Sequence, residues 1–173
     1  MPRSNFRVSV TKDYLGFASA HFITFPGHRC ESLHGHNYRM RVVVEGGLDP
    51  EAHYIVDFSE LKRLMKQLTD ELDHRVLLPL DHPKLQIADQ GDGLTVAHEG
   101  RLRYRFPKDD CVVLPIPNTT VEMLAQYLAG RLHAALEQSA GRAVDLDTIE
   151  VEVEETAGQS AIYRDSFTRR PES

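Results

Sequence analysis

The sequence predicts an α+β domain in which two helices cover one face of an antiparallel four-stranded sheet. Segments that alternate between apolar and polar residues lie near both ends of the chain, and two amphipathic segments lie between them. The resulting order is strand, strand, helix, an inserted segment, helix, strand, strand. Neighbouring strands of this kind pair as hairpins, and the two helices then share one face of the sheet.

The first two strands are predicted at residues 6–10 and 38–45. The first alternates apolar and polar residues from Phe6 to Val10. In the second, the apolar residues fall on one face and the charged residues on the other, and Gly46-Gly47 ends the strand. The apolar face consists of Tyr38, Met40, Val42 and Val44, and the charged face of Arg39, Arg41 and Glu45.

Each helix is predicted from a capping pattern followed by apolar residues at spacings of three and four. In the first helix the cap is formed by Asp57 and Glu60, and the apolar residues are Phe58, Leu61, Leu64, Met65, Leu68 and Leu72. In the second, Thr119 and Glu122 fit a capping box, and the apolar residues are Val121, Leu124, Ala125, Leu128, Leu132 and Leu136.

The last two strands are predicted at residues 148–155 and 161–167. In the first of them, Glu155 ends an apolar row formed by Ile149, Val151 and Val153. An unpaired carboxylate on a buried face is costly, so Glu155 is expected to face a partner such as a ligand. Its neighbour Glu154 falls on the opposite, solvated face.

The most informative local pattern is His34-Gly35-His36, with Cys30 four residues before it and His21 upstream. Residues at i and i+2 of a strand point to the same side, and Gly35 between them lets backbone or a ligand approach closely. Three imidazoles from a strand pair predict a zinc (Zn2+) site with one open position. A thiol beside it suits a base or nucleophile. The alternative from these residues alone is a set of surface histidines in a loop.

Composition limits the class of protein. The chain has 173 residues, enough for one domain spanning 1–173, and its net charge of −6 argues against a nucleic-acid binder. Apolar runs are too short for a membrane span, and the first five residues carry no apolar export signal, so a cytoplasmic protein is expected.

Two cysteines do not form a disulfide framework, although a single Cys30–Cys111 bridge stays open as an alternative.

An insert of about residues 80–114 separates the two halves. Within it, residues 93–106 predict a hairpin that turns at Glu99-Gly100. Its second strand alternates arginines with apolar residues: Arg101, Arg103 and Arg105 against Leu102, Tyr104 and Phe106. The favoured interpretation is a decorated hairpin with a solvated basic face. The alternative is that the arginines contact a triphosphate or another subunit.

Several motifs in one order resemble the 6-pyruvoyl-tetrahydropterin synthase superfamily, most closely its 6-carboxytetrahydropterin synthase branch of bacterial queuosine biosynthesis. They are Phe17-x-x-Ala20-His21, Cys30-x3-His34-Gly35-His36, Asp57-Phe58-x-Glu60-Leu61-Lys62, Asp73-His74, Thr120-x-Glu122, Glu155-Thr156 and Ile162-Tyr163-Arg164. The resemblance runs from Phe6 to Arg164 and excludes the insert. It implies the tunnelling fold, a homo-oligomer of two stacked trimers, and active sites between subunits. Exposed sheet edges would be satisfied by such an assembly.

The resemblance also implies a role for each motif residue. Zinc would be bound by His21, His34 and His36, and the general base would be Cys30. A proton relay would be formed by Asp73 and His74, from a neighbouring subunit, and the pterin would be anchored by Glu155 and held by Thr120 and Glu122. The residues alone also allow plainer interpretations: a helix terminus for Asp73-His74, a helix cap for Thr119 and Glu122, and a strand surface for Arg164.

The implied reaction is that of a lyase acting on 7,8-dihydroneopterin triphosphate, which releases triphosphate and acetaldehyde and leaves 6-carboxytetrahydropterin. The three residues between Cys30 and His34 resemble the spacing of the carboxy-forming enzymes. One alternative is a 6-pyruvoyltetrahydropterin synthase, which eliminates triphosphate without breaking a carbon–carbon bond. Another is a pterin- or purine-binding protein without turnover.

Overall fold

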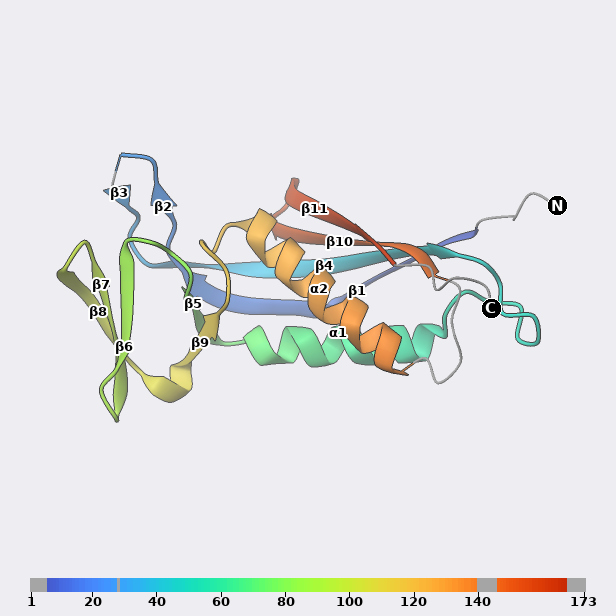
Figure 1. Cartoon of the computed structure of the whole chain (residues 1–173), viewed down its shortest axis with the longest axis horizontal. Coiled ribbons are helices and arrows are strands. Elements are labelled where there is room, and N and C mark those ends of the chain that lie inside the picture. Colours follow the sequence, from blue (N-terminus) through green and yellow to red (C-terminus); the bar gives the residue numbers. More distant parts are fainter. Residues whose placement is uncertain (1–5, 28, 140–145, 168–173) are drawn as a thin grey trace.

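The computed structural model describes residues 6–27, 29–139 and 146–167 (Figure 1). The N-terminal segment 1–5 and the polar tail 168–173 lie outside the described residues. The described part contains a six-stranded sheet in the order β11-β10-β4-β1-β5-β9, a two-stranded pair β2-β3, and a three-stranded sheet β6-β7-β8.

Four strands of the main sheet are antiparallel, as predicted. β1 (Phe6–His21) pairs with β4 (His34–Gly46), β4 with β10 (Leu146–Thr156), and β10 with β11 (Gln159–Ser166). The predicted alternation holds in β4 and β10, because the expected apolar rows are buried: Tyr38, Met40, Val42, Val44, Ile149, Val151 and Val153. The charged residues of the opposite face are partly or fully exposed.

Two short strands extend this sheet beyond the four expected ones. β5 (Arg75–Pro79) runs parallel to β1, and β9 (Cys111–Leu114) runs parallel to β5, so the sheet is mixed. Leu77 and Leu78 are both fully buried although they point to opposite faces. A strand covered on both faces lacks alternation, which explains why the sequence pattern did not reveal it.

Both helices cover the same side of the main sheet (Figure 1). α1 (Phe58–Leu72) packs on β1, α2 (Val121–Ser139) packs on β10 and β11, and the two helices contact each other. Their apolar stripes join the inward rows of β4 and β10 in one hydrophobic core. The predicted stripes are confirmed, except that Phe58 is exposed and Val121 is only half-buried.

The caps of the helices differ in detail from the predicted capping boxes. Asp57 caps α1 by accepting a hydrogen bond from the Ser59 N–H at 2.7 Å, but Glu60 pairs with Arg63 instead of returning to the cap. At α2 the prediction that Thr119 caps the helix was wrong by one residue. The Thr120 hydroxyl accepts from the Met123 N–H at 3.4 Å, because the Thr119 side chain is committed elsewhere.

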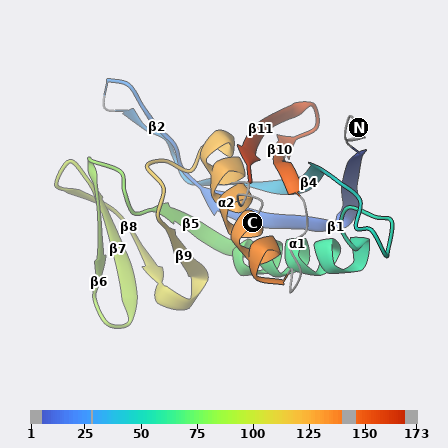
Figure 2. The same cartoon turned by 45° about the vertical axis from the view of Figure 1, so that its right-hand side comes forward.

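The insert forms its own small sheet at one end of the main sheet (Figure 2). It consists of β6 (Leu85–Asp89), β7 (Gly93–His98) and β8 (Arg101–Pro107), followed by the short helix η1 (Lys108–Asp110). The predicted hairpin is β7–β8. Leu102 is 68% exposed, unlike Tyr104 and Phe106, because the register shifts between Val96 and Ala97.

A second hydrophobic cluster joins the insert to the main sheet. It is built on Phe22, Leu78, Leu85, Leu94 and Val96. The pair β2 (Thr24–Phe25) and β3 (Arg29–Cys30) lies beside it, between the end of β1 and the start of β4. Among the described residues, no helix is long and apolar enough to cross a membrane.

An irregularity in β1 sets which side chains face the helices. Val10 pairs with Val42 and Phe17 with Tyr38, so β1 advances by seven positions while β4 advances by four. The three extra residues reverse the parity of β1, because side chains alternate with a period of two. Val10 faces the core before the irregularity, and Phe17 and His21 face it afterwards.

Gly16 is required where this irregularity closes, which gives a first prediction. A Cβ atom at Gly16 would lie 2.5 Å from the Tyr38 carbonyl oxygen, so Gly16→Ala forces the backbones of β1 and β4 apart. We expect it to destabilise the protein by about 1–3 kcal/mol. In α2, a Cβ atom at Gly130 would meet nothing within 4 Å. The matched control Gly130→Ala should therefore stabilise the protein by about 0.5–1 kcal/mol.

Urea unfolding monitored by circular dichroism measures both changes. Equal effects of the two substitutions would show that the close contact at Gly16 does not exist.

Candidate active site

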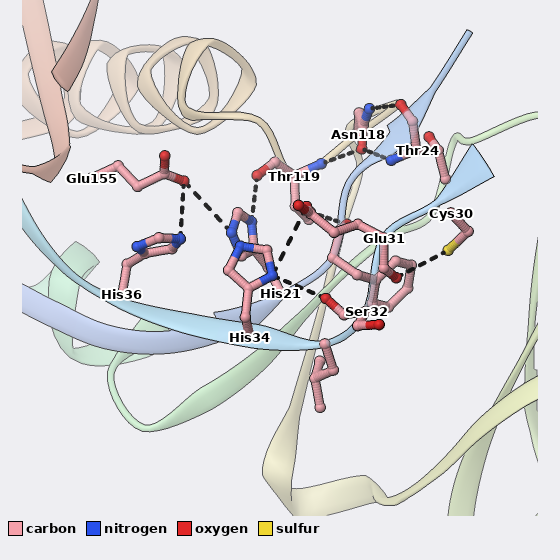
Figure 3. Close-up of polar contacts among 12 residues, drawn as sticks. His21, Thr24, Cys30, Glu31, Ser32, His34, His36, Asn118, Thr119 and Glu155 are labelled. Carbon is pink, nitrogen blue, oxygen red and sulfur yellow. Dashed lines mark hydrogen bonds and ion pairs between the residues drawn. The ribbon is translucent and has the colours of Figure 1, made fainter. Parts of the chain in front are cut away.

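Three histidines meet at the end of the main sheet, as the sequence predicted. His21 ends β1, and His34 and His36 open β4, where His21 pairs directly with His34. One ligand nitrogen from each lies within 4.8 Å of the others, and this group could hold a metal ion. Figure 3 shows the three rings converging from the two neighbouring strands. This juxtaposition excludes the alternative of histidines scattered over a surface loop.

Two backbone carbonyls orient two of these rings. The His21 Nδ1 atom lies 2.8 Å from the Thr119 carbonyl oxygen, and the His34 Nδ1 atom lies 3.0 Å from the Ser32 carbonyl oxygen. A carbonyl oxygen only accepts hydrogen bonds, so Nδ1 carries the proton in both rings. Nε2 is then the nitrogen that each ring has available for a metal, an orientation that metal-binding histidines share.

The environment of His21 fits a metal ligand. The residue is 0% exposed, and its Nε2 atom is buried without a hydrogen-bond partner. Burial lowers the pKa of His21 below its ordinary value, and the neighbouring His34 and His36 act in the same direction, although the Thr119 carbonyl opposes them. A neutral, orphaned nitrogen in a buried site is costly unless something binds it. The donor set therefore suits a metal cation such as zinc.

Glu155 lies on the side of the apolar row, as strand parity predicted, and its carboxylate faces the histidines. Its Oε1 atom lies 3.5 Å from His21 Nε2 and 3.6 Å from His36 Nε2, and the Tyr38 hydroxyl donates to it at 3.5 Å. Burial raises the pKa of Tyr38 well above its ordinary value, and the Glu155 carboxylate adds to this shift. The Tyr38 hydroxyl therefore stays protonated and keeps donating to Glu155.

Glu154 lies on the other face of β10. Its carboxylate pairs with Arg39 at 3.8 Å and accepts a hydrogen bond from the Gly158 N–H at 3.0 Å. Both glutamates line one open cleft of the sheet, but of the two it is Glu155 whose carboxylate lies beside the histidines.

Cys30 and Cys111 are both free thiols, so the alternative disulfide between them is absent. The Cys30 Sγ atom lies 3.6 Å from the Glu31 carbonyl oxygen, and Figure 3 shows it pointing toward that segment rather than toward His36. Burial raises the pKa of the Cys30 thiol, while the positive charge of Arg103 lowers it in opposition. Cys30 therefore needs a further nearby positive charge to act as a thiolate at neutral pH.

Glu31 was not identified as a site residue from the sequence. Its Oε2 atom is buried without a hydrogen-bond partner and lies 3.9 Å from His34 Nδ1. A buried carboxylate oxygen without a donor is rare and marks a candidate functional group. The only sequence signal was a carboxylate next to Cys30 and three residues before His34. A loop acid of this kind is common, so the pattern alone did not single it out.

Asp73 and His74 form a pair at the end of α1. The Asp73 Oδ1 atom accepts from the Ala18 N–H at 2.7 Å, and its Oδ2 atom lies 2.9 Å from His74 Nδ1. The Ala18 N–H, and then His74, lower the pKa of Asp73 below its ordinary value. His74 has a positive φ of 57° and its side chain is 82% exposed. The pair is therefore positioned by the fold but open to solvent.

An open cleft of about 860 Å³ brings some of these residues together. Its lining includes His36, His74 and Glu155, with a floor of the small residues Ala18, Ala20 and Gly35. Cys30 is not part of this lining.

Among the described residues, the motif residues Thr120, Glu122 and Arg164 form no hydrogen bond or ion pair with the three histidines. Thr120 caps α2, and Glu122 is exposed on the first turn of that helix. Arg164 pairs with Glu150 and Glu45 on the open face of the sheet, in agreement with the plainer interpretation of a strand-surface arginine. Thr119, next to the cap, contributes to the site through its backbone carbonyl, which no side-chain pattern could reveal.

The fold and site define a protein of the tunnelling-fold class with three histidines that could hold a metal. The family model for 6-pyruvoyl tetrahydropterin synthase matches residues 9–166. The chain therefore belongs to the 6-pyruvoyl tetrahydropterin synthase family, and it is a member of a pterin synthase family of enzymes.

Individual relatives agree with this assignment. A Methanocaldococcus jannaschii protein provisionally named 6-carboxy-5,6,7,8-tetrahydropterin synthase is 35% identical over 150 residues, which cover 87% of this chain and 90% of the relative. A Pyrococcus furiosus protein named dihydroneopterin monophosphate aldolase is 39% identical over 61 residues, which cover 35% of this chain and 50% of the relative.

Solved structures show that the likeness includes nearly the whole chain. The 6-pyruvoyl tetrahydropterin synthase of Plasmodium falciparum has a TM-score of 0.88 and 32% identity, with 95% of this chain and 100% of that chain covered. A variant of the Plasmodium vivax enzyme has a TM-score of 0.87 and 29% identity, with 95% and 99% covered. In that variant, a glutamate described as a catalytic residue is replaced by alanine.

Proposed function

We propose that this protein is a zinc-dependent 6-carboxytetrahydropterin synthase. It would convert 7,8-dihydroneopterin triphosphate and water into 6-carboxytetrahydropterin, acetaldehyde and triphosphate. The observation that carries the proposal is the cluster of the buried His21 with the half-buried His34 and His36, next to a segment bearing both a thiol and a carboxylate. Relatives that carry this enzyme name support the choice of product.

The three histidines would hold the zinc ion, with the His21 and His34 rings binding through the Nε2 atoms that the Thr119 and Ser32 carbonyls leave free. Zinc, when bound, supplies Lewis acidity to oxygen atoms of the substrate side chain. The protein's part is to bury His21, whose lowered pKa keeps protons from competing for its ligand nitrogen.

Glu155 would anchor the pterin. The guanidine-like edge of a pterin offers two neighbouring donors, which match the two oxygens of a carboxylate. Its position beside His21 and His36 would place the ring so that the side chain reaches the histidines. The Tyr38 hydroxyl holds one carboxylate oxygen in place from the buried side.

Cys30 would act as the general base on the substrate side chain, and His74, held by Asp73, would carry the complementary proton. The Asp73–His74 pair opens onto the same cleft as His36 and Glu155, which fits a relay to a substrate in that cleft or in the cleft of a neighbouring subunit. The sheet has edges at β9 and β11, and an oligomer of two stacked trimers would satisfy them.

The proposal places the enzyme in the cytoplasm, in the route to queuosine. Thr120 and Glu122 would help to hold the pterin only if a neighbouring subunit brings a substrate to the start of α2.

A second candidate function is supported by Glu31. Its carboxylate oxygen without a partner lies beside His34, a Plasmodium vivax neighbour has a catalytic glutamate, and one relative is named an aldolase. With Glu31 as the base, the same site would cleave the pterin side chain in the manner of an aldolase. The pyruvoyl-forming reaction and a binding protein without turnover stay further alternatives.

Product analysis with two matched variants separates these possibilities. Zinc-loaded protein is incubated with 7,8-dihydroneopterin triphosphate, and the products are identified by mass spectrometry. We expect 6-carboxytetrahydropterin and acetaldehyde. Cys30→Ala should lower the rate by about 100-fold or more, because a general base contributes about 10²–10⁴-fold. Glu31→Gln should change the rate by less than about fivefold, because Glu31 is not the general base in this proposal.

A larger loss of rate in Glu31→Gln than in Cys30→Ala, together with a pterin product that carries a hydroxymethyl group, would support the aldolase. A pyruvoyl product would support the 6-pyruvoyl enzyme, and unchanged substrate would contradict all three reactions.

The anchoring role of Glu155 predicts unequal effects of two neighbouring glutamates. Glu155→Gln should weaken binding of a neopterin ligand by about 2–5 kcal/mol, because one partner of a buried charged hydrogen-bonded pair is lost. Glu154→Gln is the matched control and should bind normally, because Glu154 pairs with Arg39 on the other face. Isothermal titration calorimetry measures both affinities, and equal losses would show that Glu155 does not contact the pterin.

A further inference from the structure

The insert contacts the segment that precedes the histidine pair. The Tyr104 hydroxyl, on β8, accepts a hydrogen bond from the Leu33 N–H at 3.0 Å. Arg103 donates to the Glu31 carbonyl oxygen at 3.4 Å. On its other side, the Glu31 N–H donates to the Ile23 carbonyl oxygen at 2.8 Å. Residues 31–33 are therefore held between the end of β1 and the insert.

Tyr104 is fixed by packing and not only by its hydroxyl. Its ring centroid lies 5.4 Å from that of Phe22 and 5.4 Å from that of Phe106, with which it stacks. Leu33 and Cys30 pack against the same apolar cluster. A ring clamped in this way can hold its hydroxyl at one place, so the Leu33 N–H is fixed relative to the body of the protein.

The clamped segment carries two groups that contact His34, the Glu31 carboxylate and the Ser32 carbonyl, and it follows directly on Cys30. Cys30 and Glu31 supply the thiol and the carboxylate, and Ser32 supplies the carbonyl that orients His34. The Leu33 N–H belongs to the peptide unit of that Ser32 carbonyl. A displacement of this one peptide therefore changes both the orientation of His34 and the approach of the loop groups.

Arg103 adds a charge to the same contact. Its guanidinium lies over the Tyr104 ring at 5.5 Å and donates to the Tyr104 hydroxyl at 3.5 Å. Among the described residues no carboxylate lies within ion-pair distance of Arg103, whereas Arg105 pairs with Asp92 at 2.8 Å. The positive charge of Arg103 is therefore left to act on its surroundings, and it lowers the pKa of the Cys30 thiol against the effect of burial.

We propose that Tyr104, supported by Arg103, is a positioning residue for the reaction: the insert braces the Cys30–Leu33 segment against the histidine cluster. The proposal rests on the proposed function for what the positioned groups do. It replaces the interpretation of the insert as a decoration of the fold, because β8 contacts the active segment through two hydrogen bonds and a shared apolar cluster.

The test removes a single hydroxyl. Tyr104→Phe keeps the ring in its packing and deletes only the two hydrogen bonds that the hydroxyl accepts, from the Leu33 N–H and from Arg103. The matched control is Tyr127→Phe on α2, because the Tyr127 hydroxyl likewise accepts from an arginine, Arg131, at 2.6 Å and lies beneath its guanidinium. Both variants are compared with the full-length wild-type protein at equal zinc content.

Three readouts separate positioning from structural support. We expect Tyr104→Phe to lower kcat about tenfold with KM changed less than twofold, because small misplacements of reacting groups cost rate more than binding. The rate of Cys30 alkylation by iodoacetamide, followed by peptide mass spectrometry, should change several-fold, whereas that of Cys111 should not. Tyr127→Phe should leave kcat and both alkylation rates unchanged.

Two results for Tyr104→Phe would contradict the positioning role. Unchanged kcat and unchanged Cys30 alkylation in Tyr104→Phe would overturn the proposal, whatever the effect on melting temperature. A rise in KM alone would also overturn it, because the hydroxyl would then be a substrate contact. If the wild-type protein turns over no pterin, the proposed function fails, and the alkylation rates of Cys30 and Cys111 still decide the positioning claim.

Discussion

The site depends on the register between β1 and β4. Three extra residues in β1 reverse its parity, so the side that carries Val10 at one end carries His21 at the other. Without this reversal His21 would point to the open face of the sheet, away from His34 and His36. Gly16 makes the arrangement possible, because a side chain there would strike the Tyr38 carbonyl. This one backbone irregularity therefore places His21 on the same side of the sheet as His34 and His36.

Backbone groups then define the chemistry of that cluster. Carbonyls from the start of α2 and from the loop before β4 fix the His21 and His34 tautomers, and burial keeps His21 neutral. The same loop carries Cys30 and Glu31, and the insert holds it through Tyr104. The metal candidate, the reactive groups and the insert are therefore connected through four consecutive residues. Through this connection the insert, which reaches the cleft lining at Asp110, would affect the proposed reaction.

Sequence periodicity was sufficient where a strand has one buried face. It placed His34, His36 and Glu155 on the helix side because β4 and β10 pair without a register shift from Thr148 to Glu154, so the same side of each strand continues to those residues. It could not place His21 by pattern, since the parity of β1 reverses within a polar stretch. It missed β5 because that strand is covered on both faces, and it assigned the cap of α2 to Thr119, whose hydroxyl instead donates to the Phe22 carbonyl. The contacts of Glu31 and Tyr104 join residues distant in sequence, which local patterns do not record.

The most direct test of the central claim is a crystal structure of the zinc-loaded protein with an anomalous difference map at the zinc edge. We expect one peak at about 2.0–2.1 Å from the Nε2 atoms of His21, His34 and His36, with Glu155 outside the coordination sphere. A peak bound through His34 Nδ1 would contradict the role of the Ser32 carbonyl. A peak bound by the Glu155 carboxylate would contradict an open fourth position, and the absence of any peak at the three histidines would contradict the metal site itself.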